Sequence, residues 1–596
     1  MKRKTILKII LWTLAVLLLI SGSLFSIGYF YYAKIIRSYL IETVSKESKG
    51  LYKADIGSLS LNILAGNLTI DKFALVPDTA LYHSRYHTDT LSPLLIQFKI
   101  DQFRIRGFNI MDAVKKRRID VNRIRFIGPD ITVYRMRMPA KTNSDKHKEK
   151  MTSIPLPKGL TSIEVREFMV ENAKLEFIDL TGDTVKRNSF PTCNIFIKNI
   201  LVDSVHQGKK RLFNADDINI KLGQYSLTPG NGMNKLSYGE IGLSTGSGEV
   251  YINNFHLEPL FSKHDYTRKL GFQTDWLDLK ISRLKLQRVN FRSLLFEGKV
   301  QAGLLTIDTL LMDDYRDKRI PLKPGFKPPM PQEGIRKLKT YLRIDTVMLK
   351  SGRINYAEQT GAVPGTIFFD KVKVTVTGLT NDSVLLHAGL VTELKGTLYL
   401  MGTGKIDATV RMNFADLRNS FTFSAQMGPF DLTQVNPMVT NLLPAKIISG
   451  KVKKVIIPLV QANDDVATGK LLFYYNDISI DLLDEKQTTW TKIKTGVIKW
   501  AANELVLNAD NPNKAGKMRT GIIYAPRIKE LGFPNYFWRC AFSGLKSTMG
   551  FNSKAQKALI KEEKAATKEK AKGEKSQKPK ENDKKEKKEK EKKKKQ

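Results

Sequence analysis

Residues 405–414 read KIDATVRMNF, and this stretch alternates polar and apolar residues without interruption. Its apolar members are Ile406, Ala408, Val410, Met412 and Phe414. Successive side chains of a β-strand point to opposite faces, so these residues would all project to one side of an extended chain. The stretch therefore predicts a strand with one apolar face.

The same alternation recurs along most of the chain from about Leu51. It is clear in LLIQFKI (94–100), AKLEF (173–177) and VKVTV (372–376), whereas sustained helical periodicity is scarce. We therefore predict a mainly β protein, and the pattern disfavours a helical bundle.

Part of the β-rich region occurs twice. Residues 59–77 match 241–259, residues 98–110 match 279–291, and residues 163–179 match 342–358, each without a gap and with shifts of 182, 181 and 179 residues. We predict two copies of one β-rich unit, at 51–225 and 235–385. Only the turn-length segment 228–232 separates them, which favours stacked units in an elongated body over two independent β-sandwiches, although the sandwiches stay open as an alternative.

A third β-rich region spans 386–552, with a short helix at Val435–Leu443. Near its end, Tyr524–Met549 is rich in aromatic residues and predicts an amphipathic helix that either caps the sheet or meets a membrane; the sequence leaves both open. Residues 553–596 are dominated by Lys and Glu, a composition that predicts a disordered tail.

The N-terminus predicts a membrane anchor. Residues 9–33 carry no charge, follow a basic stub at 1–8, and are long enough to span a hydrocarbon core of ~30 Å. A cleaved signal peptide is the alternative, but its apolar run is typically only ~7–15 residues long. Basic residues stay on the cytoplasmic side, so the body would lie on the far side, which is the periplasm in a bacterium with two membranes. Residues 34–50 predict a short amphipathic helix that leads off the membrane.

Size and charge limit the function classes. The chain has 596 residues, too many for one hydrophobic core, and a formal net charge of +39, which favours anionic partners such as a membrane surface. The mean hydropathy of −0.27 excludes a polytopic membrane protein. Nucleic acid is disfavoured as a partner, because the basic residues are spread along strands and no nucleic-acid-binding module is visible.

We find no catalytic or metal-binding motif. The seven histidines form no HExxH pair, GTGK at 402–405 lacks the rest of a phosphate loop, and the acidic pairs Asp313–Asp314 and Asp464–Asp465 would point to opposite faces of a strand. Cys193 and Cys540 are too far apart in sequence for a zinc or redox motif; two free thiols are favoured over a long-range disulfide. The sequence thus predicts a protein that is not an enzyme and uses no cofactor or metal.

Several of these stretches resemble a known family. A basic stub and one apolar segment, followed by LYKADIGSLSLNILAGNLTIDKFALVP (51–77) and KKRRIDVNRIRFIGPDITVYR (115–135), resemble the N-terminal part of the AsmA-like, TamB-related envelope proteins. SFTFSAQMGPFDLTQVNPMVTNLLPAKIISGKV (420–452) resembles their C-terminal part. The resemblance covers roughly residues 5–550 and does not extend to the tail.

The resemblance implies an inner-membrane-anchored periplasmic protein in which a twisted antiparallel β-sheet forms a long groove, apolar inside, that guides phospholipid in envelope lipid homeostasis and outer-membrane biogenesis. A strand with one apolar face must cover that face with a sheet, a helix or a lipid, and covering helices are few in this sequence. The alternative is a non-catalytic envelope scaffold with closed β-sandwiches that binds envelope proteins. The lipid-facing candidates are Phe98, Ile100, Leu175, Phe177, Val374 and Val410.

Overall fold

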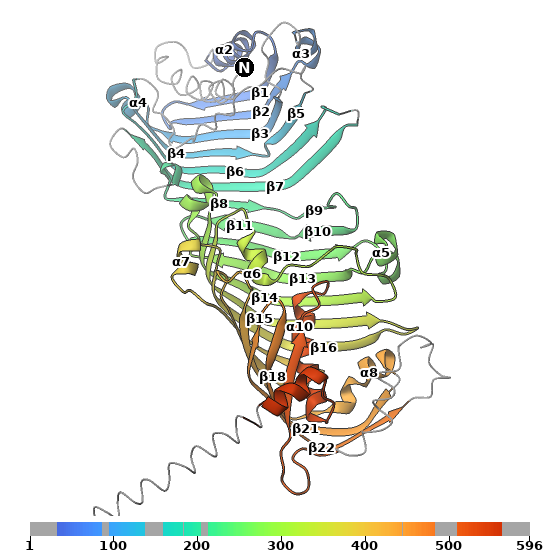
Figure 1. Ribbon diagram of the computed structural model, residues 1–596. Helices are drawn as coiled ribbons and strands as arrows, with labels where there is room; N and C mark the ends of the chain where they lie inside the picture. The colour runs from blue at the N-terminus through green and yellow to red at the C-terminus, as the bar shows by residue number, and fades with distance from the viewer. Residues whose placement is uncertain are drawn as a thin grey trace, which may run out of the picture. The chain divides into compact units, whose positions relative to one another are not determined.

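The computed structural model describes residues 32–85, 94–136, 159–182, 184–203, 212–443, 445–482, 509–562 and 565 (Figure 1). The predicted stub at 1–8 lies outside these ranges, as does the predicted membrane-spanning segment except for its last two residues. Most of the predicted tail at 553–596 also lies outside them, but residues 554–562 at its start form a helix, and Gln556 is buried and donates to the Ile522 carbonyl at 2.6 Å. Within the described ranges, no helix combines the length and the apolar character needed to cross a bilayer. The described chain is mainly β, as the alternating patterns predict.

The chain forms two compact units. Unit 1 comprises Met1–Leu257 and Ile281–Thr306, and unit 2 comprises Glu258–Lys280 and Ile307–Gln596. Strands β12 (Glu249–Pro259), β13 (Asp275–Gln287) and β14 (Val300–Asp317) contribute residues to both units.

Unit 1 is a sheet with short helices at its ends. Its strands are β1 (Tyr52–Asn62), β2 (Asn67–Pro77), β3 (Leu94–Phe108), β4 (Arg118–Ile127), β5 (Asp130–Arg135), β6 (Ser162–Asp179), β7 (Lys186–Asp203), β8 (Asp217–Leu222), β9 (Tyr225–Leu227), β10 (Asn234–Tyr238), β11 (Glu240–Ser244) and β12 (Glu249–Pro259). Its helices are α2 (Tyr32–Glu47), α3 (Thr79–Arg85), α4 (Ile110–Lys116), η1 (Leu212–Asn214) and η2 (Ser293–Glu297).

Helix α2 occupies the position where the sequence predicts a short amphipathic helix, and it covers one end of the sheet. Leu40 and Val44 lie one turn apart on it and are each 5% exposed. Leu40 packs into a cluster with Ile56, Ile70 and strands β3, β4 and β6, and Val44 packs into a second cluster around Tyr82. Apolar burial on one helical face therefore anchors α2 to the strands that follow it.

The predicted antiparallel sheet is wrong in one respect, because the sheet is mixed. Strand β6 runs parallel to both β4 and β5, with Ile124 opposite Phe168 and Ile131 opposite Leu175. Strand β6 runs antiparallel to β7, as β1 does to β2 and β15 to β16. Parallel neighbours need a connection of a dozen or more residues, and the segment between Arg135 and Ser162 provides that length.

Unit 2 contains a second sheet region with helices on it. Its strands are β15 (Leu342–Gln359), β16 (Gly365–Thr380), β17 (Thr392–Leu400), β18 (Gly404–Met412), β19 (Phe421–Met427), β20 (Phe430–Asp431), β21 (Ala445–Ala462), β22 (Val466–Leu482) and β23 (Thr520–Pro526). Its helices are α5 (Lys263–Leu270), α6 (Pro331–Arg336), α7 (Ser383–His387), η3 (Leu432–Val435), α8 (Asn436–Leu442) and α10 (Phe533–Thr548).

The order and spacing of elements along the chain follow the repeated sequence. Strand β2 (Asn67–Pro77) and strand β12 (Glu249–Pro259) have the same length and lie 182 residues apart. Special backbone conformations recur at the same spacing: Gly66 and Gly248 have φ of +61° and +69°, and Lys72 and Asn254 have φ of +55° and +52°. At Gly66 a Cβ atom would come within 2.2 Å of the Phe108 carbonyl oxygen, so this turn requires glycine.

Candidate functional site

An apolar row crosses five strands of unit 2. Val347 of β15 lies opposite Val376 of β16, which lies opposite Leu394 of β17, and the row continues to Val410 of β18 and Phe423 of β19. Directly paired residues share one face of a sheet, so these five side chains form one continuous strip.

A second row runs beside the first on the same face. Its members are Leu349, Val374, Gly396, Ala408 and Ala425. Every position in the two rows is apolar or glycine, so no hydrogen-bonding side chain interrupts this strip.

Protein covers only part of this face. Val410 and Phe423 are 6% and 5% exposed and belong to the largest buried cluster of unit 2. Leu394 packs against that cluster from its margin. Val347 and Val376 are half-buried and belong to none of the buried clusters of the described chain. The strip thus passes from a closed core into a region that protein leaves partly open.

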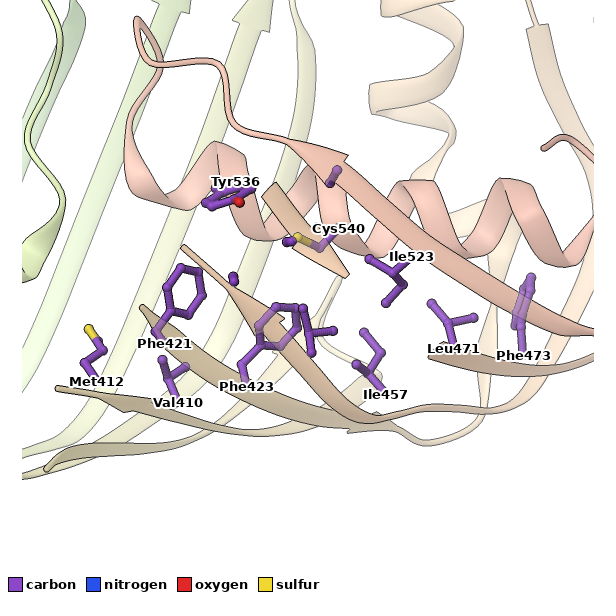
Figure 2. Close-up of a cluster of buried hydrophobic side chains, with 14 of the residues drawn as sticks. Val410, Met412, Phe421, Phe423, Ile457, Leu471, Phe473, Ile523, Tyr536 and Cys540 are labelled. Atoms are coloured by element: carbon purple, nitrogen blue, oxygen red, sulfur yellow. The ribbon is translucent and has the colours of Figure 1, made fainter. Parts of the chain in front are cut away.

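Helix α10 covers the closed part (Figure 2). It begins at Phe533 with Pro534 in its first turn, where proline costs no helical hydrogen bond. Phe533, Tyr536, Phe537 and Cys540 then recur at helical spacing, and the first three contact the Phe421 ring with centroid distances of 5.2, 5.9 and 5.6 Å. One face of the aromatic segment therefore caps the sheet. Trp538 and Phe542 on this helix are 57% and 40% exposed, and contact of the segment with a membrane stays a prediction.

A glycine lets α10 approach the strands closely. Gly544 lies against Leu471 of β22 and Ile523 of β23, and a Cβ atom on it would be 2.8 Å from the Leu471 Cβ and 2.9 Å from the Ile523 Cγ1. Real side-chain contacts are longer than this, so the helix would have to move to accommodate even alanine.

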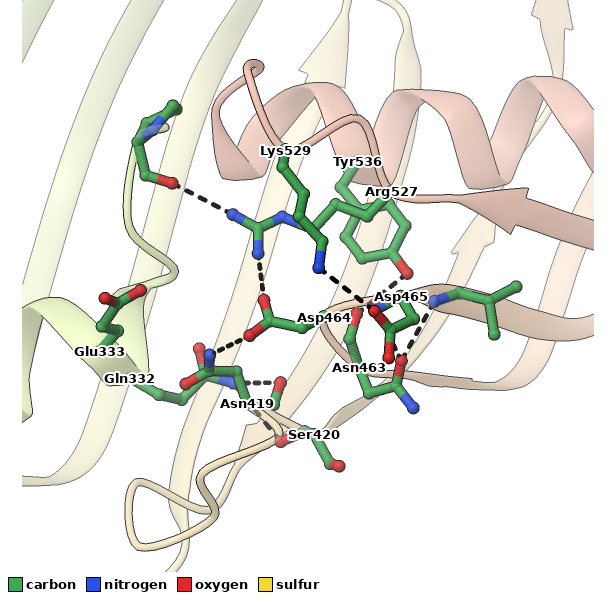
Figure 3. A network of polar contacts seen from close by, with 12 residues as sticks. Gln332, Glu333, Asn419, Ser420, Asn463, Asp464, Asp465, Arg527, Lys529 and Tyr536 are labelled. Carbon is green, nitrogen blue, oxygen red and sulfur yellow. Dashed lines mark hydrogen bonds and ion pairs between the residues drawn. The ribbon is translucent and has the colours of Figure 1, made fainter. Parts of the chain in front are cut away.

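A polar network fixes this covered end (Figure 3). The Arg527 guanidinium forms an ion pair with Asp464 and donates to the Pro328 carbonyl at 3.1 Å. The Asn419 amide donates to the other Asp464 oxygen at 2.5 Å, and the Tyr536 hydroxyl donates to the Asn463 carbonyl at 3.1 Å. The network joins the start of α10 to turns of the sheet, so we assign it a structural role.

The acidic pairs examined in the sequence have different surroundings. Asp464 and Asp465 lie in the turn between β21 and β22 rather than on a strand, and they pair with Arg527 and Lys529 respectively. Asp313 and Asp314 do lie on a strand, β14; Asp313 is exposed, whereas burial and the neighbouring Asp275 carboxylate raise the pKa of Asp314 to about 7. Cys193 and Cys540 are both free.

The described residues contain no group of three or more His, Cys, Asp or Glu side chains placed to hold a metal ion. Burial raises the pKa of Cys540 to about 12, so its thiol stays protonated at neutral pH. The expectation of a protein without metal or catalytic site stays a prediction.

The lipid-facing candidates occupy two kinds of environment. Ile100 and Val410 are 4% and 6% exposed inside protein cores. Val374 and Phe177 are half-buried, and so is Phe98, which packs against the core of unit 1. Leu175 is 39% exposed. Lipid contact at these residues stays a prediction, and the most accessible of them are Leu175, Phe177 and Val374.

The structure brings two of these candidates onto one row in unit 1. Phe98 of β3 lies opposite Ile131 of β5, which lies opposite Leu175 of β6. Val374 and Val410 likewise lie in adjacent rows on one face of unit 2.

Unit 1 also has a half-buried apolar row that the sequence reasoning missed. It runs through Val170, Ile195, Ile220, Leu243 and Val250, on β6, β7, β8, β11 and β12. Alternation along each strand indicates which residues share a face, but the register that lines them up across strands is a tertiary property.

The chain matches no protein-family model, and a comparison of its sequence with curated proteins found no match.

Proposed function

We propose that this chain is an AsmA-like envelope protein that binds phospholipid acyl chains on the apolar face of its sheet and guides them along a groove between membranes. In this proposal residues 9–33 anchor the chain in the inner membrane, the N-terminus is cytoplasmic, and the duplicated β-rich body lies in the periplasm. The supporting observation is the half-buried apolar strip at Val347, Leu349, Val374 and Val376.

The chemistry of the strip favours an acyl chain over a protein partner. Exposing apolar surface to water costs about 25 cal/mol per Å², so a contiguous apolar strip that is partly exposed favours any ligand that removes water from it. Protein interfaces carry roughly one hydrogen bond per 100–200 Å², and the two rows of unit 2 offer none from their side chains. A hydrocarbon chain needs none.

Site-specific photo-crosslinking in cells tests this proposal. The photoreactive residue p-benzoylphenylalanine replaces Val374, and mass spectrometry identifies the adducts on the full chain. We expect phospholipid adducts, because Val374 lies on the apolar strip. Thr375 is the matched control, since the same replacement there points to the opposite face of the same strand.

The lipid-binding proposal and the scaffold alternative predict different adducts. Phospholipid adducts at 374 and not at 375 would support lipid binding. Protein adducts at 374 would support the alternative, a non-catalytic envelope scaffold. Equal lipid adducts at both positions, or none at either, would overturn the lipid proposal.

A further inference from the structure

Four arginines line a pocket on unit 1. They are Arg104 and Arg106 of β3 and Arg123 and Arg125 of β4, and the pocket has a volume of about 110 Å³. In the antiparallel register Arg104 lies directly opposite Arg125, and Arg106 lies directly opposite Arg123. The adjacent residues Phe103, Ile105 and Ile124 are buried in the core, so the arginines occupy the other face of the sheet.

Carboxylates neutralise only half of this cluster. Glu167 of β6 pairs with Arg123 at 2.5 Å, and Glu171 holds Arg125 through two hydrogen bonds of 2.7 and 2.5 Å. The neighbouring Arg118 is matched in the same way by Glu164. The pairing of β4 arginines with β6 glutamates is therefore systematic.

The β3 side has no such match. Among the residues that the structure describes, no carboxylate lies within ion-pairing distance of Arg104 or Arg106. Asp71 on β2 attracts Arg104 at longer range, but its carboxylate already accepts hydrogen bonds of 2.7 Å from Ser58 and from Gln102. The pocket therefore carries two positive charges in excess.

Directly opposed like charges destabilise a sheet pair, and these two cross-strand pairs are both Arg–Arg. An anion bound between the arginines would attract both members of each pair, so the cluster would then stabilise the pairing of β3 with β4. The guanidinium group presents a planar fork of donors that matches phosphate oxygens in pairs, which a lysine ammonium cannot do. The pocket volume is several times what one water molecule requires.

We propose that the pocket formed by Arg104, Arg106, Arg123 and Arg125 binds a phosphate group, with Arg104 and Arg106 as the residues free to neutralise it. The site lies on the face of the sheet opposite to the apolar row of unit 1 that contains Val170. The proposal therefore does not depend on the proposed lipid-binding function. Phosphate of a soluble compound and phosphate of a lipid headgroup at a membrane surface share this chemistry.

Equilibrium dialysis of the full chain in nonionic detergent against radiolabelled inorganic phosphate tests the site, at constant ionic strength set with chloride. The test variant is Arg104→Gln with Arg106→Gln. The control is Lys99→Gln with Lys174→Gln, which removes the same charge from exposed residues of β3 and β6 outside the pocket. We expect phosphate affinity to fall at least about tenfold in the test variant and to be unchanged in the control.

Thermal unfolding gives a second readout. In phosphate-free buffer the test variant should be at least as stable as the natural chain, because it loses two like-charge contacts. Added phosphate should raise the melting temperature of the natural chain and of the control, and not that of the test variant. Absence of saturable phosphate binding, or an equal loss in both double variants, would overturn the proposal.

A competition experiment separates the two sources. Mixed micelles of the nonionic detergent with phosphatidylglycerol are added to the dialysed complex of the natural chain, with phosphatidylcholine micelles as the comparison. Displacement of phosphate by phosphatidylglycerol and not by phosphatidylcholine would assign the site to lipid headgroups. Retention of phosphate in the presence of both kinds of micelle would assign it to a soluble phosphate compound.

Discussion

The covered and uncovered parts of the unit 2 strip have the same sequence pattern but different surroundings. Val410 and Val374 both lie on strands in which apolar and polar residues alternate, and both face the same side of the sheet. Val410 is nevertheless buried in the cluster that includes residues of α10, whereas Val374 is half-buried. The difference arises from a helix more than 100 residues downstream. Apolar alternation alone thus identifies a face that must be covered, and tertiary structure decides what covers it.

An aspartate at each position gives the largest contrast. Val410→Asp would bury an unpaired carboxylate among Phe423 and its neighbours, and we expect a loss of about 3–5 kcal/mol in the free energy of unfolding. Val374→Asp keeps access to solvent and should cost under about 1.5 kcal/mol. Urea unfolding followed by circular dichroism measures both.

Thr375→Asp, on the opposite face beside Val374, serves as the reference for the added charge alone. If Val374→Asp unfolds the chain as severely as Val410→Asp, the strip at Val374 is a closed core. Retained folding with reduced phospholipid recovery would instead support acyl-chain contact there.

Two helix glycines sharpen the role of α10. Gly544→Ala would press a methyl group onto Leu471 and Ile523, and we expect a loss of about 1–3 kcal/mol. Gly334→Ala in α6 meets no atom within 4 Å and should be neutral or stabilise by up to about 1 kcal/mol through helix propensity. Thermal unfolding of the two variants measures both effects. An unchanged melting temperature for Gly544→Ala would show that α10 does not pack closely on the strands.

The smallest expected effect depends on pH. Burial and Asp275 raise the pKa of Asp314 to about 7, above the unfolded value of about 3.9, so the folded state holds this proton more tightly. The tighter binding of this proton stabilises the folded state fully below about pH 4, and that stabilisation is lost as the pH rises to about 7.

Asp314→Asn removes this titration. Between pH 6 and pH 8 the free energy of unfolding of the natural chain should therefore fall by about 1 kcal/mol relative to that of the variant. Urea midpoints at the two pH values measure it, with Asp313→Asn on the opposite face as the control. A difference between the natural chain and Asp314→Asn that stays constant across this range would contradict the assigned pKa.

Sequence patterns predicted the secondary structure where local physics determines it. Alternation at 405–414 corresponds to β18, because it reflects which side chains share a face. The helix predicted at Tyr524–Met549 corresponds to α10, except that residues 524–526 belong to β23. The parallel direction of β6 was missed because strand direction depends on the connection, here residues 136–161, and the alternation within β6 reads the same in either direction.

The arginine pocket shows the same limit. RIR at 104–106 and RIR at 123–125 are visible in the sequence as two repeated triplets, but basic residues spread along strands do not reveal which of them lie side by side. Only the register of β3 with β4 brings the four guanidinium groups together, and only the position of β6 shows which two remain unmatched.

The thiol of Cys540 provides a natural reporter of motion in the cap. It lies on α10 with no exposed surface, so a thiol reagent can reach it only after the helix has lifted from the strands. With Cys193 replaced by serine, the labelling rate of the Cys540 thiol would report how often α10 lifts from the strands.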